Sequence, residues 1–115
     1  MSIELQSVQE FKDLIEQTIV NKTILVTKLY FDWCPHCQKI REPFEALARR
    51  YLSQKVQFLS IDMDQWPEVA QVMDVNAGPT FIILRGNTII QRVEGANLQK
   101  VEQALSQIPI VHRSF

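Results

Sequence analysis

Apolar side chains recur along the chain in two alternating patterns, one with helical spacing and one typical of strands. Runs with period two, or with apolar residues on both faces, predict strands at residues 3–6, 24–31, 56–62, 80–85 and 88–94. Apolar residues three or four positions apart predict helices at residues 7–21, 38–52, 67–73 and 97–108, the last stopping before Pro109.

Short polar, glycine and proline signals support these boundaries. Ser7 and Glu10 form a capping-box pattern at the start of the first helix. Gly86 and Asn87 separate the last two strands, where a two-residue turn would join them into a hairpin. Pro43 lies inside the second helix, where its missing N–H predicts a kink.

The order of elements predicts an α/β fold with a central mixed sheet of about five strands, flanked by four helices. Residues 24–31 are apolar on both faces, as expected for a central strand covered by helices. The carboxyl end of such a strand is where an open α/β sheet usually carries its chemistry. We expect one domain over residues 1–109 and a short tail over residues 110–115.

Composition and charge exclude several classes of function. The 115 residues are 46% apolar, which is enough for one core without disulfide staples. A net charge of −1 argues against a nucleic-acid binder and against a polybasic membrane anchor. The longest apolar stretch, residues 19–31, is interrupted by Lys22 and Lys28, and no secretion signal is recognisable. We therefore expect a cytoplasmic protein that contacts neither membranes nor nucleic acids.

The two cysteines, Cys34 and Cys37, stand in one Cys-Pro-His-Cys run where a strand ends and a helix begins. The unpaired N–H groups of a helix N-terminus favour a thiolate at Cys34. Pro35 suits the first helical turn, and His36 adds a dipolar or cationic group beside the sulfur. Cys37 lies one turn further on, which suits a thiol that resolves a mixed disulfide formed by Cys34.

Two other interpretations of the pair are weaker. A pair of ordinary buried cysteines would have this spacing before a helix only by chance. A structural zinc ion needs four ligands, and the only histidines of the chain are His36 and His112. Asp62 and Asp64 lack a third ligand nearby in the sequence, so we expect no metal site.

Three segments, in order and at matching spacing, carry a resemblance to a known family. Residues 32–39 read Asp-Trp-Cys-Pro-His-Cys-Gln-Lys and are followed by Pro43. Residues 77–80 read Ala-Gly-Pro-Thr, and residues 93–96 read Val-Glu-Gly-Ala. Together they resemble the active-site segment, the cis-proline loop and the glycine turn of the thioredoxin family, and the resemblance covers the chain up to its tail.

The resemblance implies a thioredoxin fold and a role for each matched residue. Cys34 would be the nucleophile, Cys37 the resolving thiol, and Pro79 a cis proline packed against the disulfide. Gly78 would offer backbone hydrogen bonds to an extended substrate. The implied docking surface consists of Trp33, Gly78, Pro79, Gly95 and Ala96.

The chain departs from the family pattern at three places. Pro35-His36 replaces the Gly-Pro dipeptide that is usual in thioredoxins. The same dipeptide is typical of bacterial periplasmic disulfide oxidases, although those proteins carry an inserted domain that this chain lacks. Pro-His between the cysteines therefore predicts a protein more oxidising than an ordinary thioredoxin. Lys28 takes the position of the family's buried aspartate, where it could favour thiolates, act as a base, or run out to the edge of the fold. Phe58 replaces the lysine that usually pairs with this aspartate in the family, so the family's buried ion pair is absent.

These observations predict a thiol–disulfide oxidoreductase that exchanges dithiol and disulfide with protein substrates. No cofactor is expected beyond the redox-active Cys34–Cys37 disulfide. A thioredoxin-reductase-like enzyme or glutathione would be the redox partner, and we expect a monomer. The alternatives are a protein disulfide oxidase or isomerase module, and a thioredoxin-fold adaptor whose partner matters more than turnover.

Overall fold

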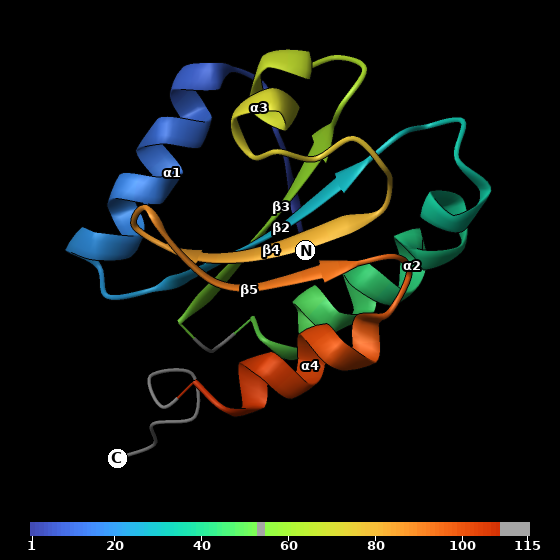
Figure 1. Ribbon diagram of the computed structural model, residues 1–115. Coiled ribbons are helices and arrows are strands. Elements are labelled where there is room, and N and C mark those ends of the chain that lie inside the picture. The colour runs from blue at the N-terminus through green and yellow to red at the C-terminus, as the bar shows by residue number, and fades with distance from the viewer. Residues whose placement is uncertain (53–54, 109–115) are drawn as a thin grey trace.

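The computed structural model describes residues 1–52 and 55–108, which form a sheet with helices on both faces (Figure 1). The strands are β1 (Ile3–Glu4), β2 (Ile24–Tyr30), β3 (Val56–Asp62), β4 (Thr80–Arg85) and β5 (Thr88–Glu94). The helices are α1 (Val8–Val20), α2 (Pro35–Arg50), α3 (Pro67–Val72) and α4 (Leu98–Ser106). The predicted mixed sheet of five strands with four helices is thus confirmed in the part of the chain that the structure describes.

The strands lie in the order β1-β3-β2-β4-β5, with β2 at the centre. Strands β1, β3 and β2 run parallel, while β4 is antiparallel to β2 and β5 is antiparallel to β4. Every residue of β2 is buried, which explains why this segment is apolar on both faces.

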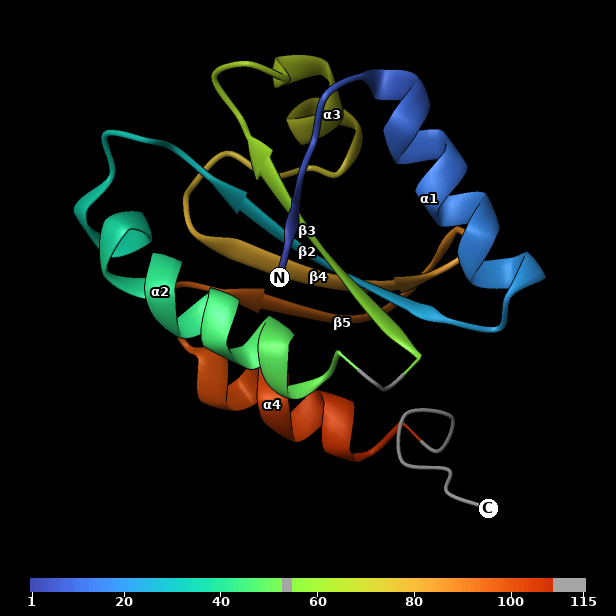
Figure 2. The ribbon, with the colours of Figure 1, turned by 180° about the vertical axis from the view of Figure 1, so that it is seen from behind.

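Two pairs of helices cover the two faces of the sheet. Helices α1 and α3 lie on one face and helices α2 and α4 on the other (Figures 1 and 2). Each pair closes a separate apolar core. The core beneath α2 and α4 includes Phe44, Phe58 and Phe81, and the core beneath α1 and α3 includes Leu25, Leu59 and Ile82.

The amino end of α2 differs from the boundary that the apolar stripe predicted. The helix begins at Pro35, three residues before the predicted start at residue 38, because Cys34 serves as its N-cap, and Pro35 lies in the first turn as expected. It continues through Pro43 to Arg50, so Pro43 does not end it. The predicted boundary at Pro109 and the tail over residues 110–115 lie outside the described residues.

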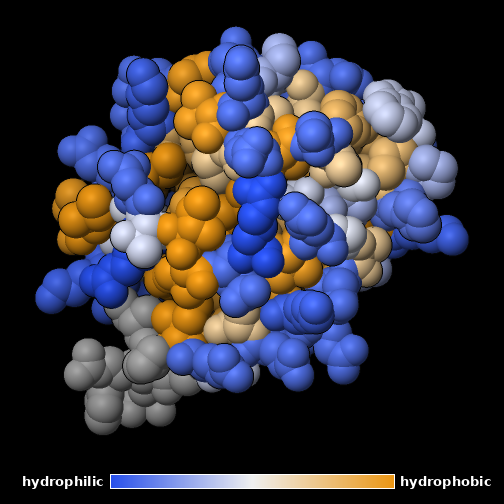
Figure 3. Space-filling view, viewed as in Figure 1, coloured by the Kyte–Doolittle hydropathy of each residue, from blue (hydrophilic) through white to orange (hydrophobic). Residues whose placement is uncertain are grey.

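The β4–β5 hairpin closes at Gly86, whose φ of +59° is a conformation that favours glycine. The Gly86 N–H donates to Thr18 Oγ1 at 2.7 Å, which ties the turn to the end of α1. Strand β5 is the edge of the sheet and leaves Ile89 and Ile90 exposed. On the face seen in Figure 3, apolar surface gathers toward the middle, between polar side chains.

Candidate active site

The two cysteines lie at the carboxyl end of β2, where the chain turns into α2. Cys34 caps the helix, and its Sγ accepts a hydrogen bond from the Cys37 N–H at 3.3 Å. The Cys34 thiol also donates to the Gly78 carbonyl at 3.5 Å. Both cysteines are free thiols, exposed by only 7% and 4%. The predicted pair is therefore one helical turn apart at a helix N-terminus, with the cis-proline segment beside it.

Gly78 and Pro79 bring the loop before β4 against the cysteines. The Gly78–Pro79 peptide bond is cis, as the family resemblance implied. A Cβ atom on Gly78 would lie 2.8 Å from Cys37 Sγ, closer than real Cβ atoms approach a neighbour. Only glycine therefore allows this backbone to pack on the Cys37 thiol.

Gly95 follows the last residue of β5 and lies next to the cis-proline segment. Its N–H donates to the Pro79 carbonyl at 2.9 Å, and its φ is +90°. Ala96 follows it and is exposed. The structure thus brings the predicted glycine turn next to the predicted cis proline, although the two are far from Cys34 in the sequence.

Trp33 is exposed by 66% but is held on two sides. Its ring stacks on Phe31 with the centroids 4.8 Å apart, and its Nε1–H donates to Asp64 Oδ2 at 2.9 Å. Asp64 is a site residue that the sequence did not reveal as such, because the contact joins segments 31 residues apart. A rigid, exposed indole beside Cys34 is suited to contact a docked polypeptide.

Pro35 and His36 are exposed in the first turn of α2. Trp66, which we expected to pack rather than to bind substrate, donates its Nε1–H to the Leu5 carbonyl at 3.1 Å and contacts the core beneath α1 and α3. Asp62 accepts a hydrogen bond from the Asp64 N–H at 3.0 Å. Within residues 1–52 and 55–108, no group of three or more metal-binding side chains comes together.

The surroundings of Cys37 shift the pKa of its thiol. Burial raises the pKa of Cys37 to about 11, and its hydrogen bond with Cys34 acts in the same direction. A hydrogen bond from the Phe31 backbone and the positive charge of Lys28 oppose this rise. Cys37 is therefore a thiol at neutral pH and must lose its proton before it can attack a disulfide.

Comparison with known proteins decides the family. The sequence profile of the family described as Thioredoxin matches residues 2–107. The chain belongs to the thioredoxin family. The thioredoxins are in general disulfide oxidoreductases, and Cys34 and Cys37 supply the Cys-x-x-Cys pair that this chemistry uses.

Relatives and solved structures agree with this assignment. The chain is 30% identical over 103 residues to an H-type thioredoxin of Brassica oleracea, covering 90% of this chain and 82% of the relative. It is 27% identical to monothiol glutaredoxin-4 of Schizosaccharomyces pombe over 93% of its length, but it spans only 42% of that longer protein. Thioredoxin NaTrxh of Nicotiana alata superposes with a TM-score of 0.86 at 26% identity, covering 98% of this chain and 93% of the other.

Lys28 is the main departure of this chain from the family pattern. Its side chain is only 3% exposed, so of the three alternatives the structure excludes the one in which it runs out to the edge of the fold. The Nζ atom lies 4.8 Å from the centre of the Tyr30 ring and 5.0 Å from that of Phe44. Burial lowers the pKa of Lys28, and the carboxylates of Glu45 and Glu4 oppose that shift.

The strand register shows which residue lies directly opposite Lys28 in the sheet. Strands β2 and β3 pair with Lys28 opposite Ser60, whereas Phe58 lies opposite Val26. Ser60 Oγ is within hydrogen-bond distance of Ser2 Oγ, at 3.1 Å. The strand register, which spacing along the chain does not specify, decides which residue stands beside the lysine.

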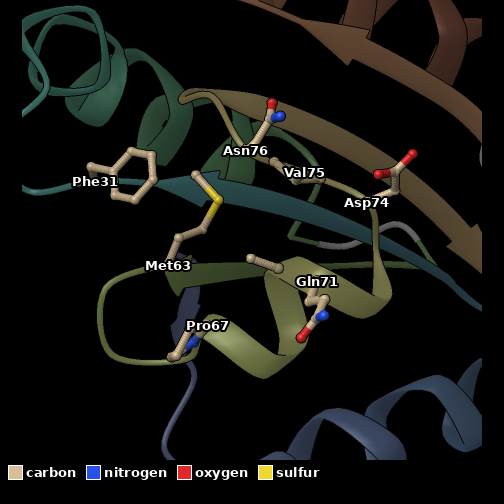
Figure 4. A pocket seen from close by; sticks show the side chains of 8 residues that line it. Phe31, Met63, Pro67, Gln71, Asp74, Val75 and Asn76 are labelled. Carbon is tan, nitrogen blue, oxygen red and sulfur yellow. The ribbon is translucent and has the colours of Figure 1, made fainter.

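A cleft of about 450 Å³, which the sequence did not predict, is lined in part by Phe31, a residue that also packs against the cysteines. Figure 4 shows it between the end of β2, helix α3 and the segment that leads to Gly78. Its lining residues are Phe31, Met63, Pro67, Ala70, Gln71, Asp74, Val75 and Asn76. Phe31 lines the cleft on one side and stacks on the ring of Trp33.

Among the described residues, no helix is both long and apolar enough to cross a membrane.

Proposed function

We propose that this thioredoxin-family protein exchanges its Cys34–Cys37 dithiol with disulfides of protein substrates and is more oxidising than ordinary thioredoxins. The observation that carries the proposal is the cap of α2, where Cys34 Sγ accepts the Cys37 N–H at 3.3 Å beneath the Gly78–Pro79 loop. A sulfur in this position can attack and can leave, because the helix N-terminus stabilises its negative charge.

The reaction has two balanced exchange steps. The Cys34 thiolate attacks one sulfur of the substrate disulfide, and the other substrate sulfur leaves as a thiolate. Cys37 then loses its proton and attacks Cys34 Sγ, so that the Cys34–Cys37 bond forms and the substrate's second sulfur leaves. The substrate gains two electrons and the protein's dithiol is oxidised.

Five residues would make the docking surface. The exposed ring of Trp33 would contact the substrate, and Gly78 would offer its backbone to an extended chain. Pro79 would pack on the exchanging sulfurs. Gly95 and Ala96 would complete the surface, a role supported by the hydrogen bond from the Gly95 N–H to the Pro79 carbonyl.

The oxidising character rests on Pro35, His36 and Lys28. A dipolar or cationic imidazole beside Cys34 and a buried cation beneath the pair would both favour the reduced, thiolate-bearing form. Stabilising that form raises the reduction potential. Equilibration with glutathione buffers should give a potential well above the value of about −270 mV typical of thioredoxin. A value near −270 mV would refute this part of the proposal.

A second part of the proposal concerns the oligomeric state, the cellular compartment and the redox partner. We propose that the chain acts as a monomer in the cytoplasm, where thiols are kept reduced, without a bound cofactor other than its own disulfide. A thioredoxin-reductase-like enzyme or glutathione would return the disulfide to the dithiol. Reduction assays with each reductant would identify which of the two is used.

Cys34→Ser tests the mechanism directly. The variant should lose all catalysis of insulin disulfide reduction, because no other thiol of the chain can start the exchange. Cys37→Ser is the matched control and should accumulate a mixed disulfide with substrate, because the resolving thiol is missing. Residual catalysis by Cys34→Ser would contradict the proposed roles. Full cellular function of the double variant would favour an adaptor instead.

A further inference from the structure

A small cavity connects the resolving cysteine with the buried lysine. It measures about 10 Å³ and is lined by Lys28, Tyr30, Phe31, Cys37 and Arg41, among others. This volume is close to the smallest that holds a single water molecule. Lys28 and Cys37 therefore line the same small cavity, and because the lysine is buried, bulk solvent screens its charge only weakly.

The charged groups around this cavity come from several elements. Glu45 on α2 and Glu4 on β1 act on Lys28 with negative charge, and Arg41 on α2 acts with positive charge. Tyr30 on β2 donates its hydroxyl hydrogen to Glu4 Oε2 at 2.7 Å. Asp62 on β3 acts on both Glu4 and Tyr30.

The lysine's head group is fixed among these groups. Nζ lies over the faces of two aromatic rings, an arrangement that attracts an ammonium ion and not a neutral amine. Two carboxylates and two ring faces therefore favour the charged form, against the burial that disfavours it.

We propose that the buried Lys28 ammonium is the positioning group that stabilises the thiolate of the resolving cysteine, Cys37. The inference rests on the proposed two-step exchange and concerns its second step only. In the mixed disulfide Cys34 carries no charge. Two cations, Lys28 and Arg41, line the cavity together with Cys37, and Lys28 is the buried one, whereas Arg41 is exposed and paired with Asp32. Cys37 gives its proton to solvent, Lys28 keeps its own, and the Cys37 thiolate then attacks Cys34 Sγ.

A two-step reaction with 5,5′-dithiobis(2-nitrobenzoate) separates the steps without a natural substrate. Cys34 attacks the reagent and releases one nitrothiobenzoate, and Cys37 then displaces the second in a first-order phase. Lys28→Met should slow this second phase by about tenfold or more at pH 7, which corresponds to one pKa unit at Cys37. The first phase should change by less than about twofold.

Two matched variants distinguish charge from packing. Lys39→Met removes a solvent-exposed lysine from α2, the helix that carries Cys37, and should leave the second phase unchanged. Lys28→Arg places a guanidinium there, which keeps its proton and its positive charge at neutral pH. The second phase of this variant should be nearly as fast as in the unmodified protein. Thermal melting followed by circular dichroism shows which variants are folded.

The outcomes separate this inference from the proposed function. Release of only one nitrothiobenzoate by the unmodified protein would contradict the two-step exchange itself. Release of two, with Lys28→Met as fast as the unmodified protein, would overturn the role of Lys28 alone. A folded Lys28→Arg variant that resolves as slowly as Lys28→Met would also overturn it, because a fixed charge would then be insufficient. If Lys28→Arg does not fold, the contrast between Lys28→Met and Lys39→Met still decides.

Discussion

The two faces of the sheet bury their polar groups in different ways. On the face beneath α1 and α3, the buried polar side chains are neutral and are bonded to backbone. Thr27 donates to the Ile82 carbonyl at 2.8 Å, and Thr18 donates to the Ile15 carbonyl at 2.6 Å while accepting the Gly86 N–H. These hydrogen bonds fix the positions of strands and turns and carry no titrating group.

The face beneath α2 and α4 buries a charge instead. Lys28 and Tyr30 interrupt an otherwise apolar core close to Cys37, and the carboxylates of Glu45 and Glu4 act on Lys28. Buried charge costs stability that an apolar residue would not. The contrast teaches that one face of the sheet is stabilised by packing and backbone hydrogen bonds, while the other buries a charge close to the cysteines.

The largest test of this contrast removes one core side chain from each face. Phe44→Ala should cost about 3–5 kcal/mol in the free energy of unfolding, because it empties a fully buried site between Phe58 and Phe81. It should also slow the second nitrothiobenzoate phase, because Phe44 is one of the two rings beneath the Lys28 ammonium. Urea unfolding and the two-phase assay measure the two effects.

Leu25→Ala is the matched variant on the opposite face. Leu25 is fully buried, so the loss in unfolding free energy should be about 2–5 kcal/mol. The second phase should stay as fast as in the unmodified protein. If both variants slowed it equally, the proposed division between the two faces would be wrong.

A smaller effect is expected from Thr27→Val, which replaces a buried hydroxyl by a methyl group of similar shape. The variant loses the 2.8 Å hydrogen bond to Ile82, so unfolding should cost about 1 kcal/mol less. Because threonine does not titrate, the difference should be the same at pH 5 and pH 8. A difference that changed with pH would show that this face is coupled to ionisable groups after all.

The smallest effect concerns Glu4 and depends on pH. Burial raises the pKa of Glu4 above its ordinary value of 4.5, so the folded protein holds this proton more tightly than the unfolded chain does. The stability contributed by this group is complete below about pH 4.5 and is lost as the pH rises through the folded pKa. Glu4→Gln removes that loss and can still accept the Tyr30 hydroxyl.

Urea unfolding at pH 4 and pH 7 measures the effect of Glu4→Gln. Relative to the unmodified protein, the variant should gain stability between the two values, with Thr27→Val as the control whose difference does not change. A relative loss of stability on going to pH 7 would mean that Glu4 is stabilised by its positive neighbours more than it is penalised by burial.

Much of the fold was predictable because its signals are local. Apolar spacing located the strands and helices, and Ser7, which accepts the Glu10 N–H at 3.0 Å, is the predicted N-cap of α1. The start of α2 was the least accurate boundary. Its cap is a cysteine, a residue type without the usual capping preference, so the apolar stripe alone did not locate it.

The chain's own sequence determined the dithiol, its place at a helix N-terminus and the resemblance to thioredoxins, because each depends on residues close together along the chain. Only the tertiary structure decided what surrounds the dithiol. It packed Gly78 on Cys37, bonded Trp33 to Asp64, and put Ser60 rather than Phe58 opposite Lys28. Strand register and helix packing bring these residues together across tens of positions, and spacing along the chain carries no information about such contacts. Whether Lys28 is buried or solvated was therefore undecided until the sheet and α2 were in place.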